Sequence, residues 1–390
     1  MDVVPLLSGE PSAADRLRAQ LGDLMEVERQ EVRRAPDEVI AFYGRLIGDV
    51  EAAFAQMLER FARLGYTAML SEAEGRQQVL AVKGLIEQRP TRRWVNVLLF
   101  AATVVTTMLI GMSPEVDPTN PRWYLSGLPF AASLMAILLA HELAHYFVGR
   151  RYGSPVSLPY FIPIPLPPLG TMGAVIFQRA PWRDRKALFD IGIAGPLAGL
   201  LVAVPLLIVG LLFTQVGRPS EFIDIQEMDQ VTQEGNSLAY LAAKYLVFGR
   251  VLPGAEGEDV WLSLPDSPGG PVAFAAWAGL LVTALNLLPI GQLDGGHVAY
   301  ALLGRRAWTL SYVAIGLLAA LGASLLMVGN MAGGTWLLWA FLGLVFGPRH
   351  PPPLNDVTPP GRGRRLVGIL LLVIFILIFV PVPLVAVPAR

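Results

Sequence analysis

Seven apolar segments follow one another along the last three quarters of the chain and indicate a membrane protein built from helices. We place them near Trp94–Met112, Leu128–Val148, Leu188–Phe213, Val272–Leu293, Trp308–Val328, Gly334–Phe346 and Leu366–Leu384. Most of them approach the roughly 20 residues that a helix needs to cross a bilayer. The sixth is short and rich in glycine, so a tilted or re-entrant path stays open for it. With 54% hydrophobic and 16% charged residues, the chain has more apolar surface than one soluble core can bury.

The predicted fold is therefore an α-helical polytopic membrane protein with about seven transmembrane helices and a short membrane-associated β/loop segment, plus a small N-terminal α+β soluble module. We assign residues 1–90 to a cytosolic α+β module and residues 91–390 to the polytopic transmembrane domain. Within the second domain we distinguish a span at 128–148, a proline-rich loop at 154–180, an acidic outer loop at 214–270, a span at 271–296 and C-terminal spans at 308–384.

The first part of the chain has the composition of a soluble module, with 13 basic and 15 acidic residues among residues 1–93. Its patterns predict an amphipathic helix over Ala13–Arg34, a strand over Val39–Ile47, a helix over Glu51–Leu64, and a hairpin of Thr67–Leu70 with Gln78–Val82. No catalytic motif lies in it, so we expect a docking or regulatory appendage.

Charges in the loops predict the orientation. With a cytosolic N-terminus, seven spans put twelve basic residues in the inner loops and four in the outer loops, as the positive-inside rule requires. Residues 1–10 lack a basic region followed by an apolar core, so we expect no cleavable signal peptide. This favours an integral protein of a bacterial inner membrane over one of an organelle.

The second apolar segment carries a metal-binding pattern. The chain has no cysteine and only four histidines, so an imidazole site must use His141, His145, His297 or His350. His141 and His145 share one helix face, and Glu142 beside them could take a proton from a metal-bound water. This HExxH spacing is a signature of zinc-dependent proteases. The competing interpretation, two core histidines and a buried carboxylate, would leave three ionisable groups in a bilayer span without a function.

A third metal ligand is expected, because a catalytic zinc site typically has three protein ligands and one open position. Asp294 is the only carboxylate between Pro271 and Arg305, and its predicted depth in the membrane matches that of the two histidines. It is the candidate, although a capping role at a broken helix end is the alternative.

Together, the HExxH motif at 141–145 and the NxxPxxxLDG motif at 286–295 resemble the site-2 protease family of intramembrane metalloproteases. Residues 170–176 and 185–199 are similar to its plastid and cyanobacterial branch, the ethylene-dependent gravitropism-deficient and yellow-green type. The resemblance covers about residues 92–385.

The resemblance implies an intramembrane zinc metalloendopeptidase that hydrolyses peptide bonds in or near transmembrane segments of membrane proteins. It implies one Zn²⁺ per chain, held by His141, His145 and Asp294. Glu142 would act as the general base, and Asn286 would stabilise the oxyanion or position the substrate. His297 is not a ligand in the family pattern and is expected at the cytosolic rim.

A substrate helix must unwind before hydrolysis, because a helix engages its carbonyls in internal hydrogen bonds. Residues 159–168 contain five prolines and cannot form a regular helix, and an apolar extended run follows at 172–178. We predict that an unwound substrate pairs with this run as an added strand, at Gly173, Ala174, Val175 and Ile176. A linker at the membrane surface is the alternative.

The expected partners are a transmembrane protein or peptide substrate and the lipid bilayer, and a net charge of −1 gives no sign of nucleic-acid binding. A proton-coupled transporter is one rival function, in which Glu142 and Asp294 relay protons, but no inverted repeat of broken helices is visible. An inactive protein that only binds membrane proteins is another. Metal analysis and a Glu142→Gln variant separate these alternatives.

Overall fold

The computed structural model describes residues 12–33, 38–85, 92–112, 119–120, 122–178, 180–218, 230–254, 258–260, 262 and 269–388. The chain forms two compact units. Unit 1 comprises Met1–Arg89, Ala180–Ala187 and Pro351–Pro360; unit 2 comprises Pro90–Arg179, Leu188–His350 and Gly361–Arg390.

Unit 1 is built on a four-stranded antiparallel sheet of order β1-β2-β4-β3. Its elements are α1 (Ala13–Ala19), β1 (Met25–Arg33), β2 (Val39–Leu46), α2 (Val50–Arg63), β3 (Tyr66–Ala73) and β4 (Arg76–Lys83). The core joins Leu17 of α1, Phe42 of β2 and Met57 and Phe61 of α2, which are all fully buried. The predicted strand at Val39–Ile47, the helix at Glu51–Leu64 and the hairpin agree with β2, α2 and β3–β4.

The single helix predicted over Ala13–Arg34 is wrong. Ser12 caps α1 through a box with Asp15, but the helix ends at Ala19, and Met25–Arg33 forms β1. That strand pairs with β2 from Met25 opposite Leu46 to Arg33 opposite Val39. The partner strand, which a helical periodicity cannot reveal, decides the conformation of this segment.

Two loop segments that the sequence analysis assigned to the membrane domain fold with unit 1 instead. Leu70 of β3 donates its N–H to Leu354 O at 2.6 Å and accepts from Asp356 N at 2.9 Å. Leu354 in turn donates to Trp182 O at 2.7 Å, and its side chain joins the core of the unit. The outer edge of β3 is thereby paired, which removes the open edge that a terminal strand would otherwise present.

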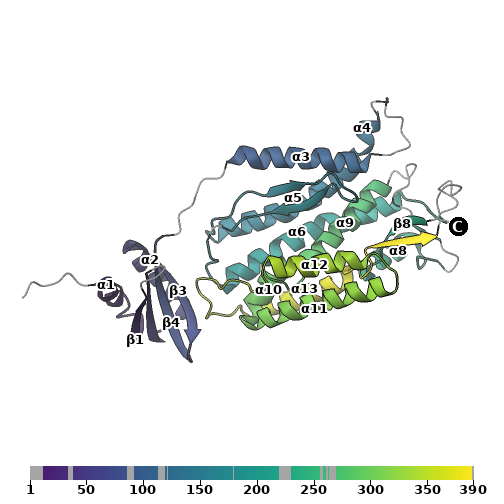
Figure 1. Cartoon of the computed structure of the whole chain (residues 1–390). Coiled ribbons are helices and arrows are strands. Elements are labelled where there is room, and N and C mark those ends of the chain that lie inside the picture. Colours follow the sequence, from purple (N-terminus) through teal and green to yellow (C-terminus); the bar gives the residue numbers. More distant parts are fainter. Residues whose placement is uncertain are drawn as a thin grey trace, which may run out of the picture. The chain divides into compact units, whose positions relative to one another are not determined.

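Unit 2 is helical, with most of its helices lying alongside one another in Figure 1. Its helices are α3 (Arg93–Gly111), α4 (Arg122–Ser126), α5 (Leu128–Arg151), α6 (Arg185–Leu212, whose first three residues belong to unit 1), α8 (Leu238–Phe248), α9 (Gly270–Asn286), α10 (Asp294–Leu303), α11 (Arg306–Met327), α12 (Gly333–Val345) and α13 (Arg362–Ile378).

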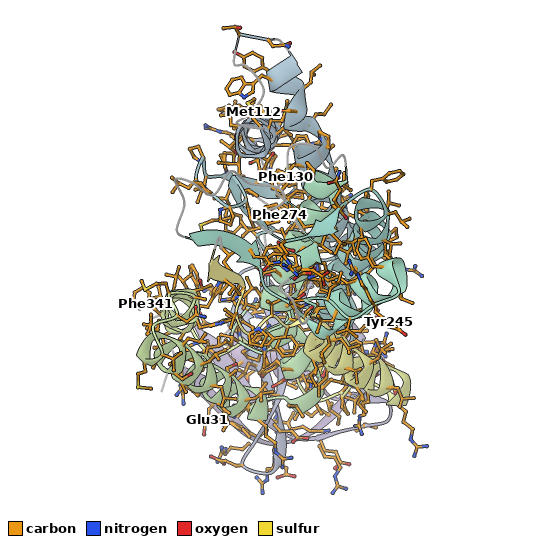
Figure 2. The ribbon with its side chains drawn as sticks, turned by 90° about the vertical axis from the view of Figure 1, so that its right-hand side faces the viewer. Glu31, Met112, Phe130, Tyr245, Phe274 and Phe341 are labelled. Carbon is orange, nitrogen blue, oxygen red and sulfur yellow. The ribbon has the colours of Figure 1, made fainter. Side chains whose placement is uncertain are left out.

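Four helical stretches among the described residues have the length and composition to cross a membrane: Arg93–Gly111, Trp123–Arg151, Arg185–Leu212 and Arg306–Met327. Helices α8, α9 and α12 are apolar but shorter. Large apolar side chains remain exposed around the unit, including Leu201 at 77% and Phe341 at 60%, and Phe341 lies at its periphery in Figure 2. Such a surface fits a lipid environment, so the chain is an integral membrane protein.

Helix α5 packs against α3 and α9. The stacked rings of Phe130 and Phe274 join α5 to α9, with centroids 5.7 Å apart; both residues are labelled in Figure 2. Helix α6 approaches α5 and α9 closely at positions occupied by glycine. A Cβ on Gly195 would lie 2.0 Å from Nε2 of His145 in α5, and a Cβ on Gly210 would lie 2.5 Å from Ala273 N in α9.

The fourth apolar segment is interrupted rather than helical throughout. Helix α9 ends at Asn286 and α10 begins at Asp294, with a turn between them that contains Pro289. The oxygen of Pro289 accepts a bond from Ser311 Oγ of α11 at 2.8 Å. A Cβ on Gly295 would lie 2.0 Å from Leu287 O, so this glycine lets α10 start directly against the turn.

Short strands complete unit 2. Strands β5 (Tyr160–Pro163) and β6 (Thr171–Val175) form a hairpin, β7 (Val216–Gly217) pairs with β9 (Asp259–Val260), and β8 (Gln230–Glu234) pairs with β10 (Leu384–Pro388). A buried polar cluster lies beside β8: Lys244 Nζ is 2.6 Å from Asp259 Oδ1, and Tyr240 donates to Glu234 at 2.8 Å. Burial raises the pKa of Glu234 to about 7, against an opposing effect of Lys244.

We predict that Gly195→Ala destabilises unit 2 by about 1–3 kcal/mol, because the new Cβ would lie 2.0 Å from Nε2 of His145 in α5. Gly316→Ala in α11 is the matched control, since its Cβ meets no atom within 4 Å. There the lower backbone entropy of alanine should stabilise the helix by about 0.5–1 kcal/mol. Thermal unfolding in detergent measures both, and equal unfolding temperatures would contradict the close approach of α5 and α6.

Candidate metal centre

Three helices bring the predicted site residues together. His141, Glu142 and His145 lie in the second half of α5, Asn286 is the last residue of α9, and Asp294 is the first residue of α10. The two histidines share a face of α5 because they are four residues apart. The turn after α9 brings Asp294 back to that face.

Both imidazoles face the carboxylate of Asp294. His141 Nε2 lies 3.1 Å from Asp294 Oδ2, His145 Nε2 lies 3.2 Å from Oδ1, and the two Nε2 atoms are 3.1 Å apart. The side chains are 5%, 11% and 13% exposed, so three ionisable groups are held together almost without water. Among the described residues, this is the group of at least three histidines and carboxylates whose geometry could hold a metal ion.

The donor set fits zinc. Two ligand atoms bound to one tetrahedral zinc ion at about 2.0–2.2 Å are about 3.3–3.6 Å apart. The separations of 3.1–3.2 Å between the imidazole nitrogens and the carboxylate oxygens require only small outward movements to reach that spacing. Two imidazoles and one carboxylate also leave a fourth position for water or substrate.

A backbone carbonyl orients His145. Its Nδ1 lies 2.7 Å from Ile191 O in α6, and a carbonyl can only accept, so Nδ1 carries the hydrogen and Nε2 presents its lone pair to the centre. Helix α6 comes this close because Gly195 and Gly199 have no side chain: a Cβ on Gly199 would lie 3.3 Å from His141 Nδ1.

Glu142 and Asn286 lie in the same region with different surroundings. Glu142 is buried, 6% exposed, and directly follows His141 in α5. The amide nitrogen of Asn286 lies 3.5 Å from His141 Nε2. Both predicted catalytic residues are therefore at the centre rather than remote from it.

His297 is not one of the three residues of this group. Its Nδ1 is 2.7 Å from Nε2 of His350, and the ring of His350 stacks on Tyr300 at 4.8 Å between centroids. The predicted substrate segment 173–176 comprises the last three residues of β6 and Ile176 after it; β6 packs against α5, which carries the two histidines.

The ion-pair partner of Asp190 lies far away in the sequence. The four basic residues that precede Asp190 in the chain predict a local partner. Asp190 binds Arg364 of α13 instead, while Lys186 pairs with Glu51. The partner lies 174 positions away, so no local signal could identify it. Sequence reasoning cannot find the role of Ile191 either, because this residue acts through its backbone carbonyl. Gly195 does have a sequence signal: the GPxxG pattern at 195–199 predicts close helix packing.

Comparison with known proteins agrees with the motifs. The family model described as Peptidase family M50 matches residues 129–328. The chain is 29% identical to the probable zinc metalloprotease EGY1, chloroplastic, of Oryza sativa subsp. japonica, over 89% of this chain and 63% of that protein. It is 28% identical to the Arabidopsis thaliana EGY1, over 88% of this chain and 66% of that protein.

A further relative is the probable zinc metalloprotease EGY2, chloroplastic, of Oryza sativa subsp. indica, 30% identical over 74% of this chain and 50% of that protein. The chain thus spans about half to two thirds of the length of these relatives. No solved structure matches it. The predicted family and its plastid-type branch are confirmed: the chain belongs to peptidase family M50, the site-2 protease family.

Proposed function

We propose that the chain is an intramembrane zinc metalloendopeptidase that hydrolyses peptide bonds in or near transmembrane segments of membrane proteins. The observation that carries this proposal is the meeting of His141, His145 and Asp294 within 4.8 Å of one another, beside the buried Glu142. The relatives are named as probable zinc metalloproteases, which supports the same ion and reaction here.

In this proposal His141 Nε2, His145 Nε2 and a carboxylate oxygen of Asp294 hold one Zn²⁺. Bound zinc supplies a Lewis acid that polarises the scissile carbonyl and makes water nucleophilic near neutral pH. Glu142 accepts a proton from the attacking water on its carboxylate and passes it to the leaving amine. Asn286, with its amide near His141, donates to the developing oxyanion or to the substrate backbone.

The rival functions explain less of this arrangement. A proton relay needs Glu142 and Asp294 but gives no reason for two imidazole nitrogens 3.1 Å apart on the same carboxylate. A protein that only binds substrates gives no reason to bury Glu142 beside them.

We predict that Asp294→Ala loses zinc, whereas Glu142→Gln retains about one zinc per chain and loses cleavage by about 10²- to 10⁴-fold. The reason is that Asp294 supplies a ligand bond, while Glu142 acts on the proton of the water. Metal analysis and cleavage of a transmembrane substrate by detergent-purified protein test this.

Glu258→Gln is the control for those variants. Glu258 lies between α8 and α9, where its carboxylate pairs with Arg250. The variant should keep both zinc and activity. Wild-type protein without zinc would refute the proposed function. Full zinc in Asp294→Ala would refute the ligand assignment alone.

We propose seven spans, α3, α5, α6, α9, α11, α12 and α13, with residues 1–90 in the cytosol. Pairing supports this count: the starts of α6 and α13 are joined by Asp190 and Arg364, while β8 and β10, which follow those helices, pair with each other. This result needs an odd number of spans from α6 through α13, and α6, α9, α11, α12 and α13 are five; α3 and α5 before them bring the proposed total to seven. For the host membrane, the sequence favours a bacterial inner membrane, whereas the relatives are described as chloroplastic; fractionation of the source cells separates the two.

We predict that Ser220→Cys, in the loop with the acidic outer residues, reacts with a membrane-impermeant maleimide in intact cells. Ser220 lies outside the described residues, and the chain has no other cysteine to react. Gly361→Cys, at the exposed start of α13, should react only after lysis. The reverse labelling pattern would invert the orientation.

We also propose that an unwound substrate pairs with β6. Supporting this, β5 is the single strand neighbour of β6 among the described residues, and Met172 and Val175 are 62% and 40% exposed. Apolar backbone at this position next to α5 suits an unwound membrane segment.

We predict that proline at Ala174 and proline at Val175 have different effects, because consecutive N–H groups of a strand point to opposite edges. One removes a donor from the β5 ladder; the other removes one from the substrate edge and should reduce cleavage by about 100-fold with zinc retained. Val175→Ala keeps the N–H and should be mild. If both proline variants retain zinc and cleave at the wild-type rate, the segment is only a linker.

A further inference from the structure

Three side chains meet near the metal centre: one from α6, one from α13 and one from the residue that follows α5. Arg364, in the first turn of α13, holds the Asp190 carboxylate of α6 by two parallel bonds, with Nε 2.7 Å from Oδ1 and Nη2 2.6 Å from Oδ2. Tyr152, which follows the last residue of α5, donates its hydroxyl to the same carboxylate and lies 3.5 Å from Arg364 Nη2. We call these three residues the α6 clamp.

The α6 clamp has the geometry of a contact that fixes positions. Two parallel bonds between a guanidinium and a carboxylate set both the distance and the plane of the pair. The side chains of Arg364 and Asp190 are 33% and 25% exposed, so water screens them less than it screens a surface pair. Arg364 lies at a helix start, where the helix dipole disfavours a cation, so helix stability does not explain its place.

Asp190 of the α6 clamp is the direct neighbour in sequence of a residue that contacts the metal centre. Asp190 is followed by Ile191, whose carbonyl accepts the Nδ1 hydrogen of His145 at 2.7 Å. Tyr152 lies about two turns after His145 at the end of the same helix. The two partners of the His145–Ile191 bond are therefore carried by α5 and α6, the helices that the clamp joins.

This bond decides how His145 meets a metal. A partner on Nδ1 fixes the tautomer and the ring direction, so that Nε2 keeps its lone pair toward the ion. A slide or rotation of α6 against α5 would lengthen the bond. Gly195, next to the ring, offers no side chain that could hold the imidazole instead.

We propose that Asp190, held by Arg364 and Tyr152, is a positioning residue for His145: the α6 clamp keeps the Ile191 carbonyl on Nδ1 and thereby sets the affinity and geometry of the metal centre. This inference rests on the proposed zinc centre.

The test measures metal binding by the full chain in detergent. In Asp190→Asn and Arg364→Gln we expect zinc to bind about 10- to 100-fold more weakly, as is typical when a partner of a metal-bound histidine is lost. The absorption spectrum of the Co²⁺-loaded protein should change as well, because the ligand field of His145 changes. The double variant should be no weaker than the worse single variant, since both remove the same pair.

Arg365→Gln is the matched control, because it removes an equal charge from the next, exposed position of α13 and should bind zinc within about twofold of wild type. Folded Asp190→Asn and Arg364→Gln proteins with wild-type zinc affinity and an unchanged Co²⁺ spectrum would overturn the inference. Should either fail to fold, Tyr152→Phe decides: it keeps the ion pair and removes only the contacts of the hydroxyl group with Asp190 and Arg364. A severalfold loss of affinity then supports the clamp, and no loss overturns it. Wild-type protein that binds no zinc would instead refute the proposed function.

Discussion

Two imidazoles and a carboxylate lie in contact in an interior made largely of apolar helices, and the arrangement of unit 2 follows from the cost of burying them. An ionised carboxylate removed from water is stable only when it is paired or bound to a metal. Asp294 therefore meets both Nε2 atoms, at 3.1 and 3.2 Å. These atoms belong to helices that are far apart in sequence. The contacts therefore form only if α5, α6, α9 and α10 pack at fixed distances from one another.

Helix α6 can pack close to the two histidines because it has glycine at the two positions that face them. Gly195 and Gly199 present bare backbone to the two histidines, so the helix can come close enough for Ile191 to accept from His145. A helix with ordinary side chains at these positions would stand farther away, and the carbonyl would be out of reach. The same closeness excludes water from that side of the centre, which strengthens the electrostatic interactions inside it.

The sequence predicts well what depends on local composition. Apolar length identified the long helices, and the HExxH spacing brought His141, Glu142 and His145 to one position on one helix. Sequence analysis fails where a residue's conformation or partner depends on a segment far away in the chain. Residues Met25–Arg33 form a strand because β2 pairs with them. The partner of Asp190 is on α13. Trp182 and Leu354 join unit 1 through backbone hydrogen bonds, which any residue type can form and which the sequence therefore does not predict. Asp294 falls between these cases, since its isolation among apolar residues marked it before its contacts were known.

The interruption between α9 and α10 has a geometric consequence for the site. In a continuous helix, Asn286 and Asp294 would be about 12 Å apart along the axis and could not meet one side chain. Here the amide of Asn286 and the carboxylate of Asp294 lie 3.5 and 3.1 Å from the same atom, His141 Nε2. Breaking a helix in an apolar environment exposes backbone groups, which must find partners within the protein. Ser311 bonds the turn at Pro289, and Gly295 lets α10 start against it. The new helix then presents its positive N-terminal end to the Asp294 carboxylate, so the break both delivers the charge to the centre and stabilises it there.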